Sequence, residues 1–446
     1  MFLKTDIRFK SIHKLAVPAL IAGIAEPLLS ITDTAIVGNI DNNATESLAA
    51  VGIVGAFISM LVWVFGQIRS VISSIVSQYL GAQKLDDIKP LPAQIMLVVV
   101  LSSLVILAIS YPFAEQIFKF YNASGIILDY CVDYFRIRIF GLPFSLFVFA
   151  VFGTFRGLQN TFYPMVIALF GAVLNIGLDW IFVYGISGVI PAMHIQGAAY
   201  ASVIAQISMA LLASFLLLKK TPISLKITLP FHKEMKRSIG MVFHLFIRTV
   251  SLNIALYFGT SYATSYGSNY IAAYTIGLNL WFLGAFIIDG YSSVGNILSG
   301  KLLGGKEYGT LLKLSNVLSK YGMLTGIVMM TLGFLFYKEI GMLFTKEEAV
   351  LKEFYAVFWL VLIMQPLCAL TFVFDAFFKG MGEMKYLRNV LLVSTFFVFI
   401  PSLFILDAFD YKLHAIWMTF LLWIFARGLP LIIKFRRKFL PLRQKN

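Results

Sequence analysis

The chain has 446 residues, of which 59% are hydrophobic and only 13% carry a charge. A soluble domain carries roughly 25% charged residues, so this composition excludes a soluble globular protein and predicts one embedded in lipid. The formal net charge of +14 does not indicate nucleic-acid binding, because the Lys and Arg residues form no single patch and gather in short segments between apolar runs.

Twelve apolar runs follow one another along the chain, and each is long enough to cross a bilayer, which takes a helix of roughly 20 residues. The first run contains Glu26 and Asp33, so no cleavable signal peptide is expected. We therefore predict an all-α polytopic membrane protein with twelve transmembrane helices. The predicted spans are 14–38, 47–80, 93–114, 130–155, 162–186, 195–218, 238–264, 270–300, 312–337, 352–378, 386–406 and 411–433.

The basic residues indicate which side of the membrane each loop occupies. They gather in the N-terminal segment, in the loop 219–237 and in the C-terminal tail, whereas the loop 39–47 contains none. Loops rich in Lys and Arg stay in the cytoplasm, and an even number of spans places both termini on one side. We expect a multi-pass protein of a bacterial cytoplasmic (inner) membrane with both termini in the cytoplasm.

Short motifs of the first half recur in the second half at a constant offset of 223 residues, as from Tyr163 to Tyr386. This offset of half the chain predicts two pseudo-symmetric six-helix lobes with a central cavity between them. In transporters built from two repeated halves, the substrate binds between the halves near the middle of the membrane. We predict an N-terminal lobe (1–218), a cytoplasmic linker (219–237) and a C-terminal lobe with a basic tail (238–446). The other matched pairs are Ala49-Ala50 with Ala272-Ala273, Leu80-Gly81 with Leu303-Gly304, and Phe155-Arg156-Gly157 with Phe378-Lys379-Gly380.

Charged side chains inside the predicted spans mark candidate functional residues, because one at mid-helix costs about 2.5–3.5 kcal/mol. Asp33 and Glu26 lie seven residues apart on the first span and share a face. Asn175 and Asp179 lie four apart on the fifth. A buried carboxyl group can take up a proton on one side of the membrane and release it on the other. Pro18 weakens the first helix, so protonation could favour a bend there.

Each of these residues also has a purely structural interpretation. Asp33 lies near the exterior end of its helix, where solvent can hydrate it. Glu26 can pair with Arg69 on the second span instead of binding a proton or cation. Asn175 and Asp179 can join two helices by hydrogen bonds, a common use of Asn in membranes. Both interpretations stay open from the sequence alone.

The second half carries a different set of charges. The positions equivalent to the two aspartates above are apolar or small, and charge appears instead at Arg248, Asp289 and Asp375. These residues are candidates for binding a cation or substrate in the second lobe. The alternative is an ion pair of Arg248 with Asp289 or Asp375, which would be structural. The two halves are therefore not expected to be chemically equivalent.

Aromatic residues make up 15% of the chain, and a cavity lined by them could hold flat organic cations through cation–π contacts. Trp63, Tyr257, Tyr262 and Trp281 are the candidates, with lipid-facing or core packing as the alternative for each. The two cysteines and five histidines show no metal-ligand spacing, so no metal site, disulfide or cofactor is expected.

A set of short segments is spread over nearly the whole chain. The segments are Leu15-Ala16-Val17-Pro18, Pro27-Leu28-Leu29, Thr32-Asp33-Thr34-Ala35-Ile36-Val37-Gly38, Leu48-Ala49-Ala50-Val51-Gly52, Leu80-Gly81-Ala82, Phe152-Gly153-Thr154-Phe155-Arg156-Gly157-Leu158-Gln159, Asn175 to Asp179, Ile195-Gln196-Gly197-Ala198-Ala199, Ile288-Asp289-Gly290, Phe374-Asp375-Ala376 and Lys379-Gly380. Together they resemble the multidrug and toxic compound extrusion (MATE) family. The last three segments resemble its branch named after DNA-damage-inducible protein F (DinF).

The resemblance implies two six-helix lobes around a V-shaped cavity and cation-coupled export of amphipathic organic cations, with bile salts and oxidants also linked to this branch. It implies coupling to H⁺, with Na⁺ used in parts of the family. Asp33 stands at the family's coupling position beside Asn175 and Asp179, and Asp375 lies where some members bind Na⁺. Glu26 departs from the pattern, which has an apolar residue there. We expect a monomeric antiporter that acts on small molecules.

Two other functions are weighed against export. A flippase for lipid-linked oligosaccharides would need basic residues in the cavity to bind pyrophosphate, and the candidates are Arg69, Arg136, Arg138, Arg248 and Arg427. A membrane enzyme would need a catalytic constellation at one depth, and the sequence shows none. It also shows no Gly-x-x-x-x-Gly-Lys-Ser/Thr motif, so ATP is not expected to drive transport.

Overall fold

The computed structural model describes residues 5–40, 43–186 and 188–442, without the side chains of 25–31, 34 and 44. Within these ranges helices dominate, and the one β-bridge joins Ile186 and Ile190. Eleven described helical segments are long and apolar enough to cross a membrane, and they correspond to the second to twelfth predicted spans. The first predicted span is the 29-residue helix α1 (Phe9–Val37). The predicted all-α polytopic class is confirmed.

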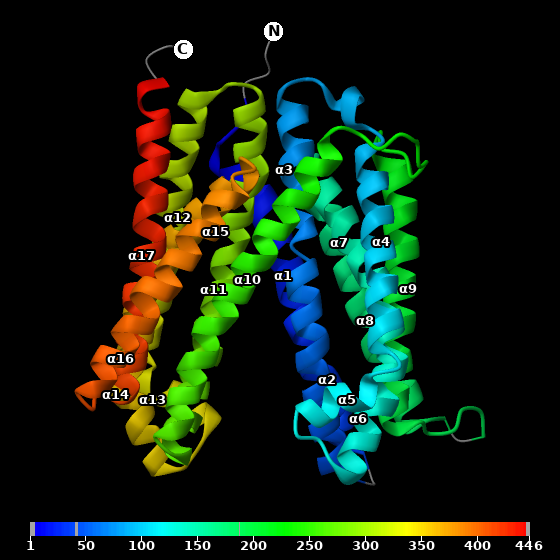
Figure 1. The fold of residues 1–446 in the computed structure, drawn as a ribbon, viewed down its shortest axis with the longest axis vertical. Helices are drawn as coiled ribbons and strands as arrows, with labels where there is room; N and C mark the ends of the chain where they lie inside the picture. Colours follow the sequence, from blue (N-terminus) through cyan, green and yellow to red (C-terminus); the bar gives the residue numbers. More distant parts are fainter. Residues whose placement is uncertain (1–4, 41–42, 187, 443–446) are drawn as a thin grey trace. The chain divides into compact units, whose positions relative to one another are not determined.

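Figure 1 shows the helices in chain order. Their bounds in the first half are α2 Ala44–Phe65, α3 Ile68–Gly81, η1 Leu85–Ile88, α4 Leu91–Ser110, α5 Ala114–Phe120, α6 Gly125–Arg138, η2 Ile139–Gly141, α7 Leu142–Gly157, α8 Phe162–Tyr184 and α9 His194–Lys220. In the second half they are α10 Glu234–Ser265, α11 Ser268–Gly304, α12 Tyr308–Leu335, α13 Tyr337–Phe344, α14 Glu348–Gly380, α15 Met384–Val393, η3 Ser394–Phe399, α16 Ile400–Ala408 and α17 Leu413–Phe439.

Three predicted spans are interrupted helices rather than continuous ones. The second span breaks between α2 and α3 at Gly66, a residue with low helix propensity. The fourth passes through the tight turn η2 just before Pro143, and the eleventh through the π-helical segment η3 just before Pro401. Proline cannot donate the backbone hydrogen bond that would continue a regular α-helix through these points.

The chain divides into two compact units, which we describe separately. The N-half unit comprises Ile21–Val76 and Lys84–Val242. The C-half unit comprises the described residues up to Leu20, Ser77–Gln83 and the described residues from Phe243 onward. The predicted lobe limits at 218 and 238 stay a prediction.

The predicted linker 219–237 is anchored within the N-half unit. Gln94 on α4 donates a hydrogen bond to the Thr228 carbonyl (2.6 Å) and accepts one from the His232 backbone (2.9 Å). The Gln94 side chain is buried, so both bonds are shielded from water. The linker therefore follows a defined path across the end of α4.

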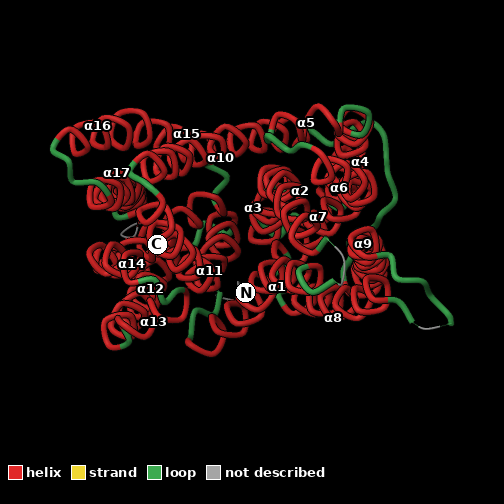
Figure 2. The backbone as a smooth tube through the Cα atoms, turned by 90° about the horizontal axis from the view of Figure 1, so that it is seen from below, coloured by secondary structure: helices red, strands yellow, loops and turns green. Residues whose placement is uncertain are grey.

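In the N-half unit, α9 packs against α6, α7 and α8, while α2 packs against α6 and α4 against α7 (Figure 2). In the C-half unit, α14 lies against α11, α12 and α17. Trp417, Phe420 and Trp423 of α17 are fully buried there and pack edge-on and tilted against one another. Each unit thus has its own aromatic-rich core.

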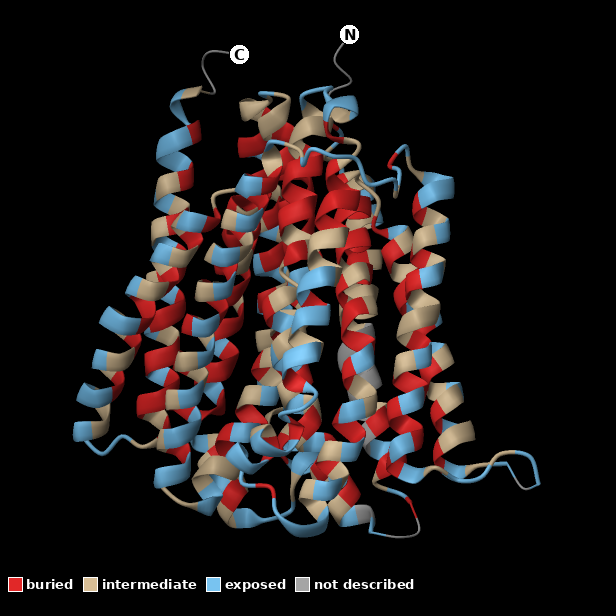
Figure 3. Ribbon diagram, turned by 45° about the vertical axis from the view of Figure 1, so that its right-hand side comes forward, coloured by how far each residue is buried: buried red, intermediate tan, exposed pale blue. Residues whose placement is uncertain are grey.

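Apolar side chains are exposed along the middle of many helices, where a soluble protein would be polar. Val173, Leu211 and Phe397 are examples, and Figure 3 shows exposed positions distributed along the helices rather than only at their ends. Lipid solvates such surfaces without the penalty that water imposes. This distribution agrees with a protein surrounded by a bilayer.

Glycine contacts recur in both halves at the offset of 223 seen in the sequence. A Cβ on Gly157 would clash with the Val76 side chain and the Ser73 carbonyl, and one on Gly380 with the equivalent Ser299 and Asn296. A Cβ on Gly304 would clash with the backbone of Gln78. Small residues allow helix backbones to approach closely in membranes, so these repeated glycines explain why the motifs recur.

Replacing Gly304 by Ala should destabilise the protein by about 1–3 kcal/mol, because the rigid backbone of Gln78 must move to admit the methyl group. The thermal unfolding midpoint of the purified protein measures the effect. Gly309→Ala on α12 is the matched control, since a Cβ there meets nothing within 4 Å, and it should be neutral or stabilising. Equal midpoints for both variants would contradict the close-packing interpretation.

Glu383 lies outside the membrane-spanning segments, in the turn between α14 and α15, and binds two lysines near the C-terminal end of α17. Its carboxylate accepts hydrogen bonds from Lys434 (2.8 Å) and Lys438. Partial burial by itself raises the pKa of Glu383, but the two lysines outweigh it and lower the pKa below the ordinary value of 4.5. The ammonium group of Lys434 also lies 3.5 Å from the centre of the Tyr386 ring.

A carboxyl group whose pKa is depressed by folding stabilises the native state above its unfolded pKa, and this contribution is lost as the pH falls. Glu383→Gln should therefore lower the unfolding midpoint at pH 7 and at pH 5 by the same amount. The difference from the unmodified protein should shrink below pH 4.5. A difference that persists unchanged to about pH 3 would show that the ion pairs contribute nothing.

Candidate functional site

Two buried carboxyl groups meet in the N-half unit, near the C-terminal ends of α1 and α8. Asp33 lies on α1 and is 7% exposed, and Asp179 lies on α8 and is fully buried. Their side chains are within hydrogen-bonding reach of each other. The two helices are also joined by the Tyr184 hydroxyl, which donates to the Ile36 carbonyl at 3.0 Å. Asp33 is therefore not a solvated carboxylate at a helix end.

Asn175 and Ser202 complete the polar surroundings of this acidic pair. The Asn175 Nδ2 donates to Asp179 Oδ2 at 2.7 Å, one helical turn away as the spacing predicts. Ser202 of α9 donates a longer bond of 3.5 Å to Asp33 Oδ2. One oxygen of each carboxyl group, Oδ1, has no hydrogen-bond donor among the described residues. The pair is therefore only partly satisfied by its neighbours.

Arg138, at the end of α6, supplies a positive charge that acts on the pair. It acts electrostatically on both Asp33 and Asp179 and interacts with the buried Tyr134 hydroxyl. From the sequence, Arg138 was expected only as a candidate for binding phosphate, and its relation to the acidic pair was not predicted. No signal in the sequence links the end of α6 to α1 and α8, because the contact is made only in the fold.

This arrangement suits a site that binds and releases protons. Two carboxyl groups in contact inside an apolar bundle share a proton more readily than they carry two negative charges. The C-terminal ends of α1 and α8 add negative partial charge from their carbonyl groups, which opposes ionisation further. Arg138 acts in the opposite direction, because its positive charge attracts a carboxylate. Substrate binding or a conformational change can then shift the pair between its protonated and deprotonated states.

Two other predicted residues belong to α1. The side chain of Glu26 lies outside the described residues, and its pairing with Arg69 stays a prediction. Pro18 lies inside α1, which continues through it as one helix. A bend at Pro18 stays a prediction.

In the C-half unit, Asp375 of α14 is enclosed by basic groups. Its Oδ1 accepts a hydrogen bond from Arg248 Nη2 of α10 at 2.6 Å. Its Oδ2 lies 3.1 Å from Lys379 Nζ, one turn along α14. Asp375 and Arg248 are each 7% exposed. The sequence analysis missed Lys379, although its spacing of four from Asp375 predicts the contact.

Both oxygens of Asp375 are thus taken by cationic groups. No group of three or more His, Cys, Asp or Glu side chains among the described residues could bind a metal ion. Asp289 of α11 is exposed and forms no described ion pair with Arg248, although its charge acts on Lys379. The geometry of this cluster does not favour Asp375 as a Na⁺ ligand.

The four candidate aromatic residues have different environments. Trp281 is buried, stacks on Phe282 and directs Nε1 to the Cys368 sulfur at 3.3 Å, so it packs in the core. Tyr262 contacts Tyr266 and Phe404 edge-on. Tyr257 and Trp63 are exposed. Trp281 therefore follows the core-packing alternative, and cavity lining by the other three stays a prediction.

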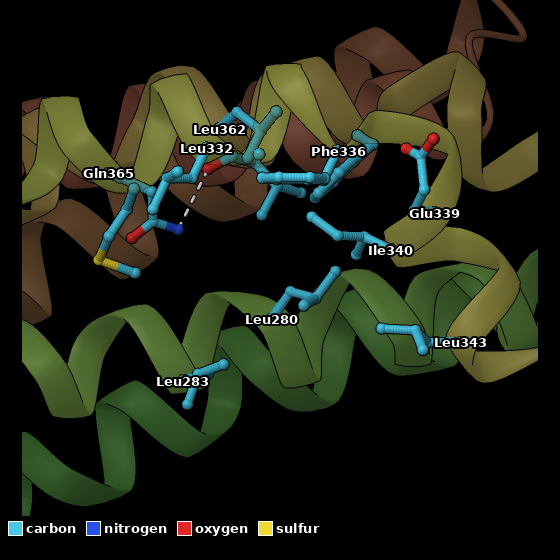
Figure 4. A pocket seen from close by; sticks show the side chains of 13 residues that line it. Leu280, Leu283, Leu332, Phe336, Glu339, Ile340, Leu343, Leu362 and Gln365 are labelled. Carbon is cyan, nitrogen blue, oxygen red and sulfur yellow. Dashed lines mark hydrogen bonds between the residues drawn. The ribbon is translucent and has the colours of Figure 1, made fainter.

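An apolar pocket of about 370 Å³ lies within the C-half unit between α11, α12, α13 and α14 (Figure 4). Leu280, Leu332 and Phe336 are among the residues that line it. Gln365 of α14 reaches it and donates to the Val361 carbonyl at 3.2 Å. Glu339 lies at its edge. Its chemistry suits an alkyl chain rather than a charged group.

Comparisons with known proteins agree on the family. The MatE family model matches residues 18–181 and 244–405, which is most of the chain. DNA damage-inducible protein F of Escherichia coli (strain K12) is 23% identical, with 96% of this chain and 92% of that protein aligned. Multidrug resistance protein NorM of Vibrio cholerae is 24% identical, with 94% and 93% aligned.

A solved structure described as MATE in the bent conformation superposes with a TM-score of 0.90. It covers 98% of this chain and 96% of its own, at 20% sequence identity, which shows the fold. Members of this family are transporters and not enzymes. The predicted resemblance is confirmed: this chain belongs to the MatE family of membrane transporters.

Proposed function

We propose that this protein is a cation-coupled antiporter that exports amphipathic organic cations or related toxic compounds across the bacterial cytoplasmic membrane. Both termini face the cytoplasm, and alternating access moves the substrate. The observation that supports this proposal most is the buried pair of Asp33 and Asp179 inside a MatE-family fold. Buried carboxyl groups in membrane helices are costly and serve as proton relays in transporters.

The coupling ion is H⁺ in this proposal. The pair offers two carboxyl groups and one amide, while the charge of Arg138 acts on both acids. A metal cation would be repelled by Arg138 and would require several oxygen ligands, whereas a single proton neutralises one carboxyl group without further ligands. Na⁺ coupling at Asp375 is the alternative, and the two basic partners of that carboxylate argue against it.

Efflux of a fluorescent organic cation from proteoliposomes tests the proposal. The protein should move the dye when a pH gradient is imposed without Na⁺. Movement only when a Na⁺ gradient is supplied would overturn H⁺ coupling and favour the C-half cluster as the coupling site. Failure of both gradients to move any such dye would overturn the export of organic cations.

A flippase for lipid-linked oligosaccharides is the second candidate function. It is favoured by one observation, the three basic residues around the single carboxylate of Asp375 in the C-half unit. Arg248 and Arg427 are buried, and Lys379 is half-buried. Translocation of a fluorescent lipid pyrophosphate between leaflets of proteoliposomes, without movement of organic cations, is the result that would select this function.

A further inference from the structure

Three basic side chains converge inside the C-half unit around one acidic group. We propose that Arg248, Lys379 and Arg427 form a binding site for an anionic group, such as a carboxylate, sulfonate or phosphate. The site is distinct from the acidic pair at Asp33 and Asp179. It does not rest on proton coupling or on the proposed direction of transport.

Three helices bring these residues together. Arg248 comes from α10, Lys379 from α14 and Arg427 from α17. Close packing of α14 and α17 depends on Gly428, where a Cβ would clash with the Thr371 side chain. The Thr371 hydroxyl in turn donates to the Ile424 carbonyl at 3.3 Å. Thr371 lies one turn from Asp375, so this contact holds Arg427 at the same level as the ion pair.

The charges in this cluster do not balance. Asp375 carries the single buried negative charge, and Arg248 and Lys379 already occupy both of its oxygens. Arg427 is only 4% exposed, and among the described residues no hydrogen bond or ion pair is found for it. It acts electrostatically on Arg248 and Asp375. The next acidic group, Asp289, is exposed and acts on Lys379, so a net positive charge remains.

Arg427 has one compensating contact. Its guanidinium carbon lies 4.5 Å from the centre of the Trp423 ring. A cation–π contact uses no N–H donor of the guanidinium group, so these donors stay available for hydrogen bonds. It does not neutralise the charge. A buried cation without a counter-charge is strongly unfavourable, so the site has a physical reason to attract an anion.

The geometry of the donors also fits an anion. A guanidinium group presents parallel N–H donors that match the two oxygens of a carboxylate, sulfonate or phosphate. Lys379 adds an ammonium group with three N–H donors, so it can bind an anion while it stays paired with Asp375. Asp375 fixes Arg248 and Lys379 in place. The ion pair therefore preorganises the site, and Arg427 contributes the unused donors.

Equilibrium dialysis tests the proposal with the full-length protein in phosphatidylcholine nanodiscs, without an ion gradient. The probe is naphthalene-2-sulfonate, and inorganic pyrophosphate is the competitor. We expect saturable binding that Arg427→Gln weakens by about ten-fold or more, the expected effect of losing a charge-assisted hydrogen bond. Arg427→Lys keeps the charge and should restore part of the affinity.

Arg436→Gln is the matched control, because Arg436 lies on the same helix but is exposed. It should bind the sulfonate as the unmodified protein does. Gel filtration checks that each variant elutes as a single species, as the unmodified protein does. A variant that passes this check and does not bind has lost binding and not folding. If Arg427→Gln folds and binds the sulfonate as tightly as the unmodified protein, the proposal is wrong.

A second set of nanodiscs separates a free anion from a lipid headgroup as the source of the anionic group. If the lipid phosphate is the ligand, phosphatidylglycerol should lower the sulfonate affinity of the unmodified protein. Native mass spectrometry should then show phosphatidylglycerol retained by the unmodified protein and lost from Arg427→Gln. If phosphatidylglycerol has no effect and sulfonate still binds, the ligand is a free anion. Absence of both sulfonate binding and Arg427-dependent lipid retention overturns the proposal, whatever the outcome of the dye-efflux experiment.

Discussion

Replacing Asp33 by Asn should reduce pH-driven dye efflux to the rate of protein-free liposomes while the protein remains folded. Asn has nearly the same shape and can still hydrogen-bond Asp179 and Ser202, but it cannot lose or gain a proton at neutral pH. Since the two carboxyl groups lie within reach of each other, removal of one ionisable member prevents proton exchange by the pair. Efflux in proteoliposomes with an imposed pH gradient measures the loss.

Asp179→Asn should have the same effect. If the two carboxyl groups share one proton, neither residue alone can alternate between the protonated and deprotonated states of the pair. Asp129→Asn is the control, since Asp129 is an exposed carboxylate on α6 in the same unit. It should transport normally. Normal transport by Asp33→Asn, or equal losses in all three variants, would contradict a specific role of the acidic pair.

Asp375→Asn should lower the free energy of unfolding by about 3–5 kcal/mol, the cost of removing one partner of a buried ion pair. The substitution leaves the buried Arg248 and Arg427 and the half-buried Lys379 without the counter-charge of Asp375. Chemical or thermal unfolding of the purified protein in a non-ionic detergent measures the effect. The loss should be partly reversed in the double variant Asp375→Asn/Arg248→Gln, because it removes one of the uncompensated cations.

Asp289→Asn is the appropriate control for this prediction. It removes the same charge from the same unit, but Asp289 is exposed and forms no described ion pair, so its effect should stay within about 0.5 kcal/mol. If Asp375 were instead a Na⁺ site, Na⁺ would stabilise the unmodified protein and Asp375→Asn would remove that increment. Stabilisation by Na⁺ that depends on Asp375 would contradict the structural role assigned here.

The arrangement of spans could be predicted from the sequence because composition and apolar run length dominate it. Lipid requires each backbone polar group to be paired within the segment, so a long apolar run has few alternatives to a helix. The interruptions at η2 and η3 were missed, although Pro143 and Pro401 mark both. Inside an apolar run, a proline alone does not show whether a helix bends, tightens or continues.

The candidate sites were predictable to different degrees. The contact of Asn175 with Asp179 follows from a spacing of four on one helix, and the same rule applies to Asp375 and Lys379. Arg138 and Arg427 could not be placed, because their relations to the acidic groups join helices far apart in the chain. Sequence spacing predicts which residues are neighbours on one helix. Contacts between helices depend on how the helices pack, which cannot be predicted from spacing within a single sequence.

If the acidic pair exchanges protons for substrate, substrate binding should release protons. A weakly buffered solution of the purified protein, followed with a pH-sensitive dye at neutral pH, should acidify when the organic cation is added. We expect this release for the unmodified protein and for Asp129→Asn, and none for Asp33→Asn/Asp179→Asn. Equal proton release by the doubly substituted protein would show that the coupled protons come from another site.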